Sequence, residues 1–342
     1  MDFNHIEYKK KFYPVNKSLE NYLFKYKRTT KLPIKYSDLL NYAEVIPITS
    51  KGKNTLWSSV IYRPSEMSRI TESFIKIYQL LSADGCDIKH LYVGSIDFCS
   101  YANSKPFRIK IINEINDNHD YYYIKKTDAS RIYGLELEHI LSPNKINFLS
   151  DKETLVEEHI IGIPGDQFIN DYVLGGMPYD KIRLAKEFVK FNERCFVRLL
   201  GDMRSYNFVI EIKQDFDKVQ YRIRAMDFDQ QSYEGGKNIY LPQFFKDNIS
   251  FVNLAQEHIS LKTAEQYCNE ARSLLKKRLM LAKNQYQELL EIMKNDTISS
   301  QENIFSLRKE LAKHYKDPEF EKAESMGEIL SLNIKNKLGI SF

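Results

Sequence analysis

Two short stretches of the sequence carry side chains that suit chemistry on a phosphate group. Residues 201–207 read GDMRSYN and residues 226–229 read MDFD, so Asn207 follows Asp202 by five positions and Asp227 comes later, after an apolar strand. Phosphoryl transfer uses one carboxylate to orient the attacking hydroxyl, with an amide oxygen and a second carboxylate holding Mg²⁺. We therefore take Asp202 as the candidate catalytic residue, and Asn207 and Asp227 as candidate metal ligands.

The elements around these residues have to bring them together. A helical pattern runs over residues 179–198 and leads directly into the 201–207 stretch. Residues 208–212 and 219–226 are rich in β-branched and aromatic side chains and predict a hairpin. This hairpin separates Asn207 from Asp227, so both residues are expected at its base.

Upstream, the apolar period changes to that of strands. We expect strands at 91–98, 107–115 and 121–126, then a helix over 131–141 with Ser130 as its cap, ending before Pro143. Two shorter strands follow near 146–149 and 154–161. Residues 162–165 (GIPG) then break the pattern and predict a linker.

The order of these motifs resembles the protein-kinase-like superfamily, closest to its aminoglycoside phosphotransferase and choline kinase branch. That branch carries H-G-D-x-x-x-x-N, which residues 200–207 match except that Leu200 stands in place of the histidine. Residues 226–229 match its I-D-F-D metal strand, and residues 157–165 (EEHIIGIPG) are similar to its hinge. The resemblance covers about residues 90–235. Two features depart from it: residues 94–104 hold a single glycine where a glycine-rich phosphate loop is usual, and no A-P-E segment follows Asp227.

The resemblance implies further nucleotide-binding residues. A lysine at the end of the third strand would reach the phosphates of ATP, and we favour Lys125, with Lys126 as the alternative. A glutamate from the next helix would hold it, either Glu136, which we favour, or Glu138. In the hinge, Glu158 and Ile160 would contact the nucleotide.

The expected fold class is α+β, a two-lobed protein-kinase-like fold with ATP and Mg²⁺ between the lobes. A small antiparallel β lobe with one helix would span residues 89–161, and a larger, mostly helical lobe would span 162–342. Residues 1–88 would form a partly helical N-terminal extension, with its clearest helix at 65–81. Beyond residue 241 the chain is expected to be mostly helical, with a long amphipathic stretch from 263 to about 293.

The composition indicates which partners and which cellular compartment to expect. The net charge is only +4 over 342 residues, which is too weak to indicate nucleic acid. The four cysteines include no C-x-x-C pair, so free thiols in a reducing compartment are expected. There is no apolar stretch of signal-peptide or membrane-spanning length. We therefore expect a cytoplasmic protein without a transmembrane segment.

The function expected from these residues is transfer of the γ-phosphoryl group of ATP to a hydroxyl group of a small molecule or protein. Two alternatives use the same fold: an inactive pseudokinase that binds nucleotide or acts as a scaffold, and a nucleotidyl transferase that moves AMP. A third alternative is a helical interaction protein whose motifs are accidental. The sequence indicates neither the acceptor nor the oligomeric state.

Overall fold

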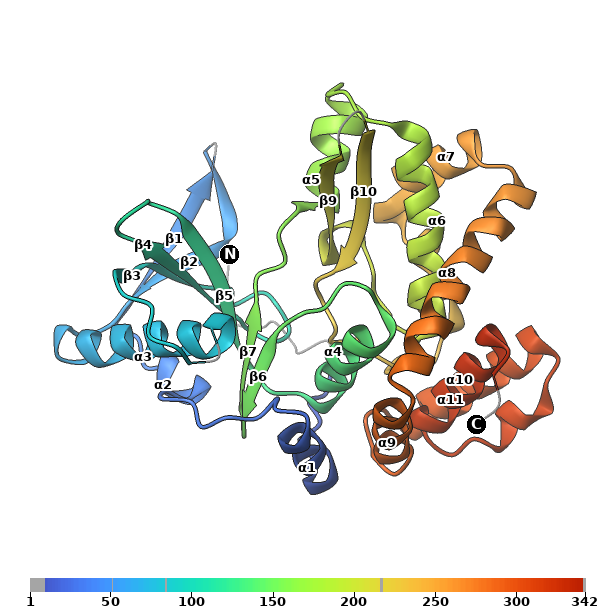
Figure 1. The fold of residues 1–342 in the computed structure, drawn as a ribbon, viewed down its shortest axis with the longest axis horizontal. Helices are drawn as coiled ribbons and strands as arrows, with labels where there is room; N and C mark the ends of the chain where they lie inside the picture. The colour runs from blue at the N-terminus through green and yellow to red at the C-terminus, as the bar shows by residue number, and fades with distance from the viewer. Residues whose placement is uncertain (1–9, 51, 84, 216–217, 341–342) are drawn as a thin grey trace. The chain divides into compact units, whose positions relative to one another are not determined.

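The computed structural model describes residues 10–50, 52–83, 85–215 and 218–340 (Figure 1). These residues form two compact units. The first comprises the chain up to residue 129 together with residues 146–159, and the second comprises residues 130–145 and the chain from residue 160 onward. The helix expected over 131–141 lies in the second of these units. The predicted division into residues 1–88, 89–161 and 162–342 stays a prediction.

The first unit is built on a seven-stranded sheet in which every neighbouring pair is antiparallel. Its strand order is β1-β2-β3-β4-β5-β7-β6. The strands are β1 (Glu44–Ser50), β2 (Lys53–Ile61), β3 (Leu91–Phe98), β4 (Phe107–Asn113), β5 (His119–Lys126), β6 (Phe148–Asp151) and β7 (Thr154–Glu158). The unit's helices are α1 (Lys17–Lys25), α2 (Tyr36–Leu39) and α3 (Pro64–Ala83).

The core of this unit lies on one face of the sheet, which α3 covers. Strand β4 alternates as its sequence predicts: Phe107, Ile109 and Ile111 are buried and the residues between them are not. They join one hydrophobic cluster with Phe74 and Ile77 of α3. The same cluster includes several side chains between Leu32 and Leu81. Much of the predicted N-terminal extension, residues 1–88, therefore contributes to the core that packs on the sheet.

The second unit is mostly helical. A small sheet in the order β10-β9-β8 comprises β8 (Ile163–Pro164), β9 (Phe208–Asp215) and β10 (Lys218–Ala225). The α-helices are α4 (Ala129–Leu141, in this unit from Ser130 on), α5 (Gly165–Phe168), α6 (Lys181–Val197), α7 (Ile249–His258), α8 (Leu261–Leu281), α9 (Lys283–Lys294), α10 (Gln301–Tyr315) and α11 (Met326–Leu338). Shorter turns are η1 (Ile169–Leu174, a π-helix), η2 (Ser205–Asn207), η3 (Lys237–Tyr240), η4 (Pro242–Phe244), η5 (Lys246–Asn248) and η6 (Pro318–Lys322).

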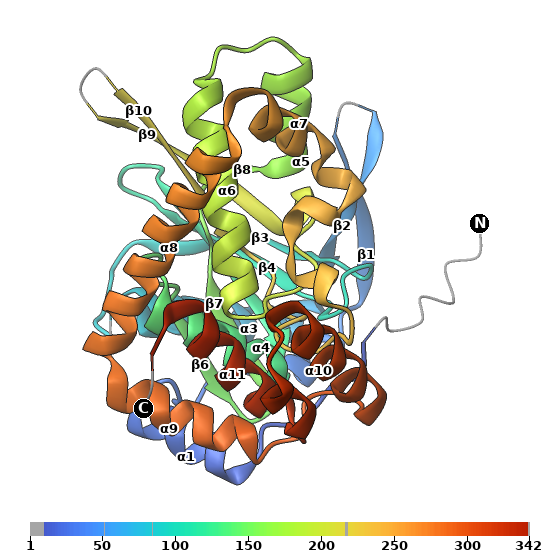
Figure 2. The same ribbon diagram turned by 90° about the vertical axis from the view of Figure 1, so that its right-hand side faces the viewer.

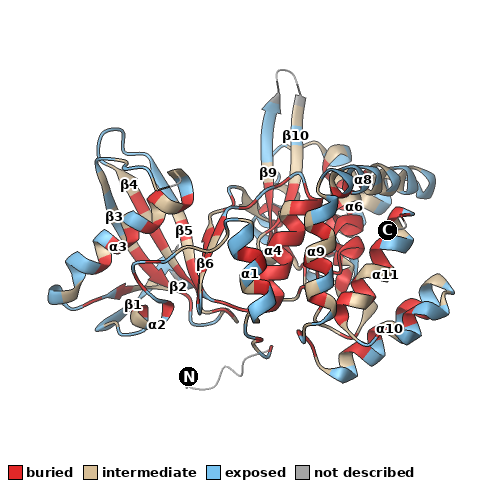
Figure 3. Ribbon diagram, turned by 60° about the horizontal axis from the view of Figure 1, so that its bottom comes forward, coloured by how far each residue is buried: buried red, intermediate tan, exposed pale blue. Residues whose placement is uncertain are grey.

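Helix α6 is the element that leads to the predicted catalytic stretch. It begins where the Asp180 carboxylate accepts a hydrogen bond from the backbone of Arg183 at 2.9 Å. Its buried stripe includes Leu184, Phe188 and Phe191. The stripe packs against α7, and α8 runs alongside α6 (Figure 2). Figure 3 shows the same pattern as red faces on α6 and largely exposed outer turns on α8.

The structure confirms the expected α+β class, with an antiparallel sheet in the N-terminal part and helices in the C-terminal part. The helical stretch expected over 263–293 consists of two helices, α8 and α9. They are divided at Ala282, whose φ of −112° and ψ of 28° are not helical. Within the described residues, no helix is long and apolar enough to cross a membrane.

Candidate active site

The hairpin β9–β10 brings the two predicted motifs to one place in the second unit. Phe208 at the start of β9 pairs with Ala225 at the end of β10. At the next pair toward the open end of the hairpin, the backbone N–H of Met226 donates to the carbonyl oxygen of Asn207 at 3.0 Å. Asp227 therefore follows directly on the residue that is bonded to Asn207, as the sequence predicts for the base of the hairpin.

The loop before η2 holds Asp202 in an unusual backbone conformation. Its φ is +55°, in the left-handed region that Asp adopts more readily than most side chains. The Asp202 N–H donates to Ile239 and its carbonyl oxygen accepts from Arg204. Leu200, which replaces the family's histidine, is fully buried and forms a β-bridge with Gln231. The loop is thus fixed by the chain segment that follows Asp227.

The side chains of Asp202 and Asn207 meet. The Asn207 amide nitrogen donates to the carbonyl oxygen of Asp202 at 2.7 Å and lies 3.4 Å from its Oδ2. Oδ1 accepts from Nε of Arg204 at 2.8 Å. This hydrogen bond raises the pKa of Arg204, so the guanidinium stays charged beside Asp202.

Arg131 of α4 binds the second motif, and nothing in the sequence pointed to it. Its Nη1 donates to Oδ1 of Asp227 at 2.7 Å and to Oδ1 of Asp229 at 2.8 Å. The Asp227 side chain is 35% exposed, whereas those of Arg131 and Asp229 are 1% and 6% exposed. The backbone N–H of Asp229 also donates to Oδ1 of Asp227 at 3.1 Å.

Helix α4 reaches this position because two small residues allow it to come close. Ser130 donates to the carbonyl oxygens of Asp229 and Gln231, which ties the start of the helix to the segment after Asp227. At Gly134, a Cβ atom would lie 2.9 Å from Cβ of Phe228. A larger side chain would push the helix away, so the glycine permits the contact between Arg131 and Asp227.

The predicted lysine has a partner inside the first unit. Nζ of Lys125 donates to Oε2 of Glu157 at 2.8 Å, and both side chains are less than 10% exposed. In the sheet, Tyr123 is directly opposite Glu157 and Lys125 is opposite Leu155, so the pair is diagonal across β5 and β7. Lys126, the alternative, is exposed and lies over the ring of Phe12. Sequence reasoning missed Glu157 as a partner, although it is the first residue of the hinge-like stretch 157–165.

The two predicted glutamates of α4 lie in the second unit. Oε2 of Glu136 accepts a hydrogen bond from Gln285 of α9 at 3.2 Å. Glu138 forms a buried ion pair with Arg198, just before the catalytic stretch. A pairing of Lys125 with Glu136 or Glu138 joins the two units and stays a prediction.

The predicted hinge residues Glu158 and Ile160 stand at the junction of the units. The N–H of Glu158 donates to the carbonyl oxygen of Asn147 within the first unit. Ile160 is buried, at 7% exposed, and begins the second stretch of the other unit. Their contact with a nucleotide also stays a prediction.

The donor types at the base of the hairpin fit Mg²⁺. Asn207 and Asp227 offer an amide and a carboxylate oxygen, and hard cations prefer such ligands. A cationic group already stands against the Asp227 carboxylate, namely the Arg131 guanidinium. Across the described chain, no three His, Cys, Asp or Glu side chains gather as a metal cluster. The candidate pair consists of one acidic residue and one amide.

Comparison with solved structures finds distant likenesses. The autoinhibited serine kinase domain of the giant muscle protein titin matches with a TM-score of 0.27 and 11% identity, covering 67% of this chain and 88% of that one. The Neurospora crassa PAN3 pseudokinase matches with a TM-score of 0.21 and 10% identity, covering 81% of this chain and 70% of that one. No protein-family model and no curated protein matches this chain. The first of these matched proteins is a kinase domain and the second a pseudokinase, and neither match indicates a branch.

Proposed function

We propose that this chain is a phosphotransferase that moves the γ-phosphoryl group of ATP to a hydroxyl group. The observation that supports the proposal is the arrangement of Asp202, Asn207 and Asp227. Their positions follow from the hydrogen bonds at the base of the β9–β10 hairpin and from the Asn207–Asp202 contact. The predicted nucleotide contacts of Lys125, Glu136, Glu158 and Ile160 belong to the same proposal.

In this proposal Asp202 accepts or orients the proton of the acceptor hydroxyl. The hydroxyl oxygen forms a bond to the γ-phosphorus, the bond from that phosphorus to the bridging β,γ-oxygen breaks, and ADP leaves. Arg204 donates to Oδ1 of Asp202 at 2.8 Å and so helps to hold this carboxylate in position. Asn207 and Asp227 would hold Mg²⁺, which supplies countercharge to the phosphate oxygens.

The experiment compares the parent chain with Asp202→Asn and Asp227→Asn. Thermal unfolding with and without ATP and Mg²⁺ reports binding, and transfer of labelled γ-phosphate to a panel of hydroxyl compounds reports turnover. We expect nucleotide to stabilise the parent and the Asp202 variant, and we expect transfer only from the parent. The same activity in all three proteins would contradict the assignment. The mass added to the acceptor separates phosphoryl transfer from AMP transfer.

One observation favours the alternative of a pseudokinase. The Arg131 guanidinium stands against the Asp227 carboxylate, so binding of Mg²⁺ by Asp227 has to compete with this ion pair. If the ion pair persists, ATP stabilises the chain to the same degree with and without Mg²⁺, and no phosphate is transferred. That result would establish nucleotide binding without catalysis.

A further inference from the structure

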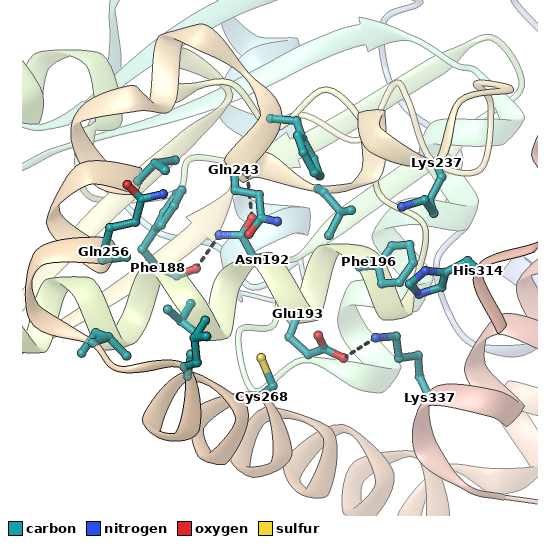
Figure 4. Close-up of a pocket in the computed structure, with 18 residues that line it drawn as sticks. Phe188, Asn192, Glu193, Phe196, Lys237, Gln243, Gln256, Cys268, His314 and Lys337 are labelled. Atoms are coloured by element: carbon teal, nitrogen blue, oxygen red, sulfur yellow. Dashed lines mark hydrogen bonds and ion pairs between the residues drawn. The ribbon is translucent and has the colours of Figure 1, made fainter. Parts of the chain in front are cut away.

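The second unit contains a cavity of about 620 Å³ that the proposed reaction does not use (Figure 4). Its walls come from α6, α7, α8, α10 and α11 and from the segment over residues 237–244. Neither Asp202 nor Asn207 nor Asp227 lines it. Its volume lies in the range of small-molecule sites, which are mostly apolar with a few placed polar groups.

The cavity has an apolar part and a cationic part. Val189, Val252 and Ile259 belong to the apolar wall. Figure 4 shows Lys237, His314 and Lys337 gathered around one end, near the ring of Phe196. The Lys337 ammonium lies 4.7 Å from the centre of that ring.

The charges at the cationic end do not balance. Of the residues that line the cavity, Glu193 carries the negative charge there, and its Oε1 lies 2.6 Å from Nε of Arg272 and 3.3 Å from Nζ of Lys337. One carboxylate thus faces two cations. A second carboxylate, that of Glu310, accepts from the backbone N–H of Lys237 at 2.7 Å and does not line the cavity. Among the residues that the structure describes, no carboxylate lies within ion-pair distance of the Lys237 ammonium.

The surroundings of His314 support this excess of positive charge. Burial lowers the pKa of His314, and the charges of Lys237 and Lys337 lower it further, against a smaller opposite effect of Glu193. Burial is also the main cause that lowers the pKa of Lys337. A bound anion would offset the repulsion among these groups.

We propose that this cavity binds an amphipathic anion, a small molecule with an apolar body and a single carboxylate. The apolar body would lie against Val189, Val252 and Ile259. The carboxylate would lie at the end formed by Lys237 and Lys337, where it accepts charge-assisted hydrogen bonds. This site does not depend on ATP or on the proposed transfer reaction.

Octanoate is the probe for the test, with octan-1-ol as the neutral match and octyltrimethylammonium as the cationic one. Calorimetry on the full chain should show one octanoate bound per chain. Octan-1-ol should bind about tenfold more weakly, because it lacks one charge-assisted hydrogen bond. The cationic probe should bind most weakly. Equal affinity for octanoate and octan-1-ol would overturn the proposal.

Two lysine variants locate the carboxylate. Lys237→Gln should lower the affinity for octanoate about tenfold and leave that for octan-1-ol unchanged. Lys313→Gln is the matched control, because Lys313 is exposed and stands next to His314 without lining the cavity. An equal effect of the two variants would contradict the proposed position of the anion.

A further measurement locates the apolar body in the unmodified protein. Octanoate should shift the methyl resonances of Val189, Val252 and Ile259, and Ala264→Trp, which fills the cavity, should remove both the shifts and the binding. Unchanged methyl resonances in the presence of bound octanoate would place the ligand elsewhere and refute the proposal. None of these measurements uses ATP. They therefore test the cavity even if the chain has no phosphotransferase activity.

Discussion

Nη1 of Arg131 lies 2.7 Å from Oδ1 of Asp227, so a helix of the second unit supplies a cation to the proposed metal ligand. The same nitrogen binds Asp229. The two aspartates differ in their surroundings, since the Asp229 side chain is almost buried and that of Asp227 is about one third exposed. The buried Asp229 carboxylate therefore stabilises the fold through its ion pair with Arg131. The Asp227 carboxylate remains accessible to solvent.

This difference predicts unequal effects on stability. Arg131→Met leaves Asp229 buried without its cation and should lower the free energy of unfolding by about 3 kcal/mol or more. Asp227→Asn should lower it by about 1 kcal/mol or less, since the exposed side chain retains access to water. Urea denaturation of the variants measures both. A larger loss for Asp227→Asn than for Arg131→Met would show that the ion pair with Asp227 dominates.

A second prediction separates the role of Asp202 from that of Asp247, the other carboxylate that binds Arg204. Asp202 and Asp247 both bind Arg204, and both side chains are about one third exposed. Asp202→Asn should lower the rate of phosphoryl transfer by a factor of about 10² or more, as expected for loss of a group that accepts or orients the proton of the acceptor hydroxyl. Asp247→Asn should keep activity within about twofold. Loss of activity in both variants would mean that the charge on Arg204 matters rather than Asp202 itself.

The lysines at the end of β5 provide a third, matched comparison. Lys125→Met breaks a buried ion pair and removes this cation from Glu157, so the free energy of unfolding should fall by about 3 kcal/mol. Lys126→Met changes an exposed side chain and should stay within about 0.5 kcal/mol of the parent. The double variant Lys125→Met with Glu157→Leu should recover most of the loss. No recovery in the double variant would show that Lys125 stabilises the sheet by packing alone.

The sequence predicted the parts of the fold that local patterns encode. Strand β3 has the predicted bounds, and the helix expected from residue 65 is α3. The break between α8 and α9 was missed because no Gly or Pro marks it, and buried residues such as Leu279 and Tyr286 continue the helical spacing on either side. The hairpin of β1 and β2 was missed as well. Strand β1 is an edge strand that contains Pro47, and several of its apolar side chains are exposed.

In the candidate site, too, the sequence predicted only what local spacing encodes. The motif spacing predicted the positions of Asn207 and Asp227 relative to the hairpin, because a hairpin joins residues at a fixed register. It did not predict Arg131 or Glu157. A buried ion pair is formed by residues distant in the sequence, and one charged residue carries no local sign of its partner.

A fourth prediction concerns pH. The pKa of His159 is lowered by burial, with Asp120 raising it and Arg108 lowering it, and its Nδ1 lies 3.0 Å from the Tyr123 hydroxyl. The unfolded chain therefore binds a proton at a higher pH than the folded chain. The parent should lose stability relative to His159→Gln as the pH falls through about 6.5. Denaturation midpoints of both proteins from about pH 7.5 to about pH 5 measure this difference, and a constant difference would contradict it.

The last prediction concerns the close approach of α5 to the catalytic loop. A Cβ atom at Gly165 would lie 2.6 Å from the carbonyl oxygen of Ser205 and 2.5 Å from Cε2 of Phe208, so the loop or the helix would have to move. Gly165→Ala should lower the free energy of unfolding by about 1–3 kcal/mol, and it should reduce phosphoryl transfer because Ser205 belongs to the same turn as Asn207.

Gly236→Ala is the control for this change. Its backbone φ of −99° suits any side chain, and the nearest atom to an added Cβ is Cδ1 of Ile239 at 3.9 Å. This variant should unfold within about 0.5 kcal/mol of the parent and keep its activity. Denaturation and the transfer assay on both variants check the argument. Equal stability of Gly165→Ala and Gly236→Ala would show that the loop yields easily, and the tight packing at Ser205 would then not be what fixes Asn207 beside Asp202.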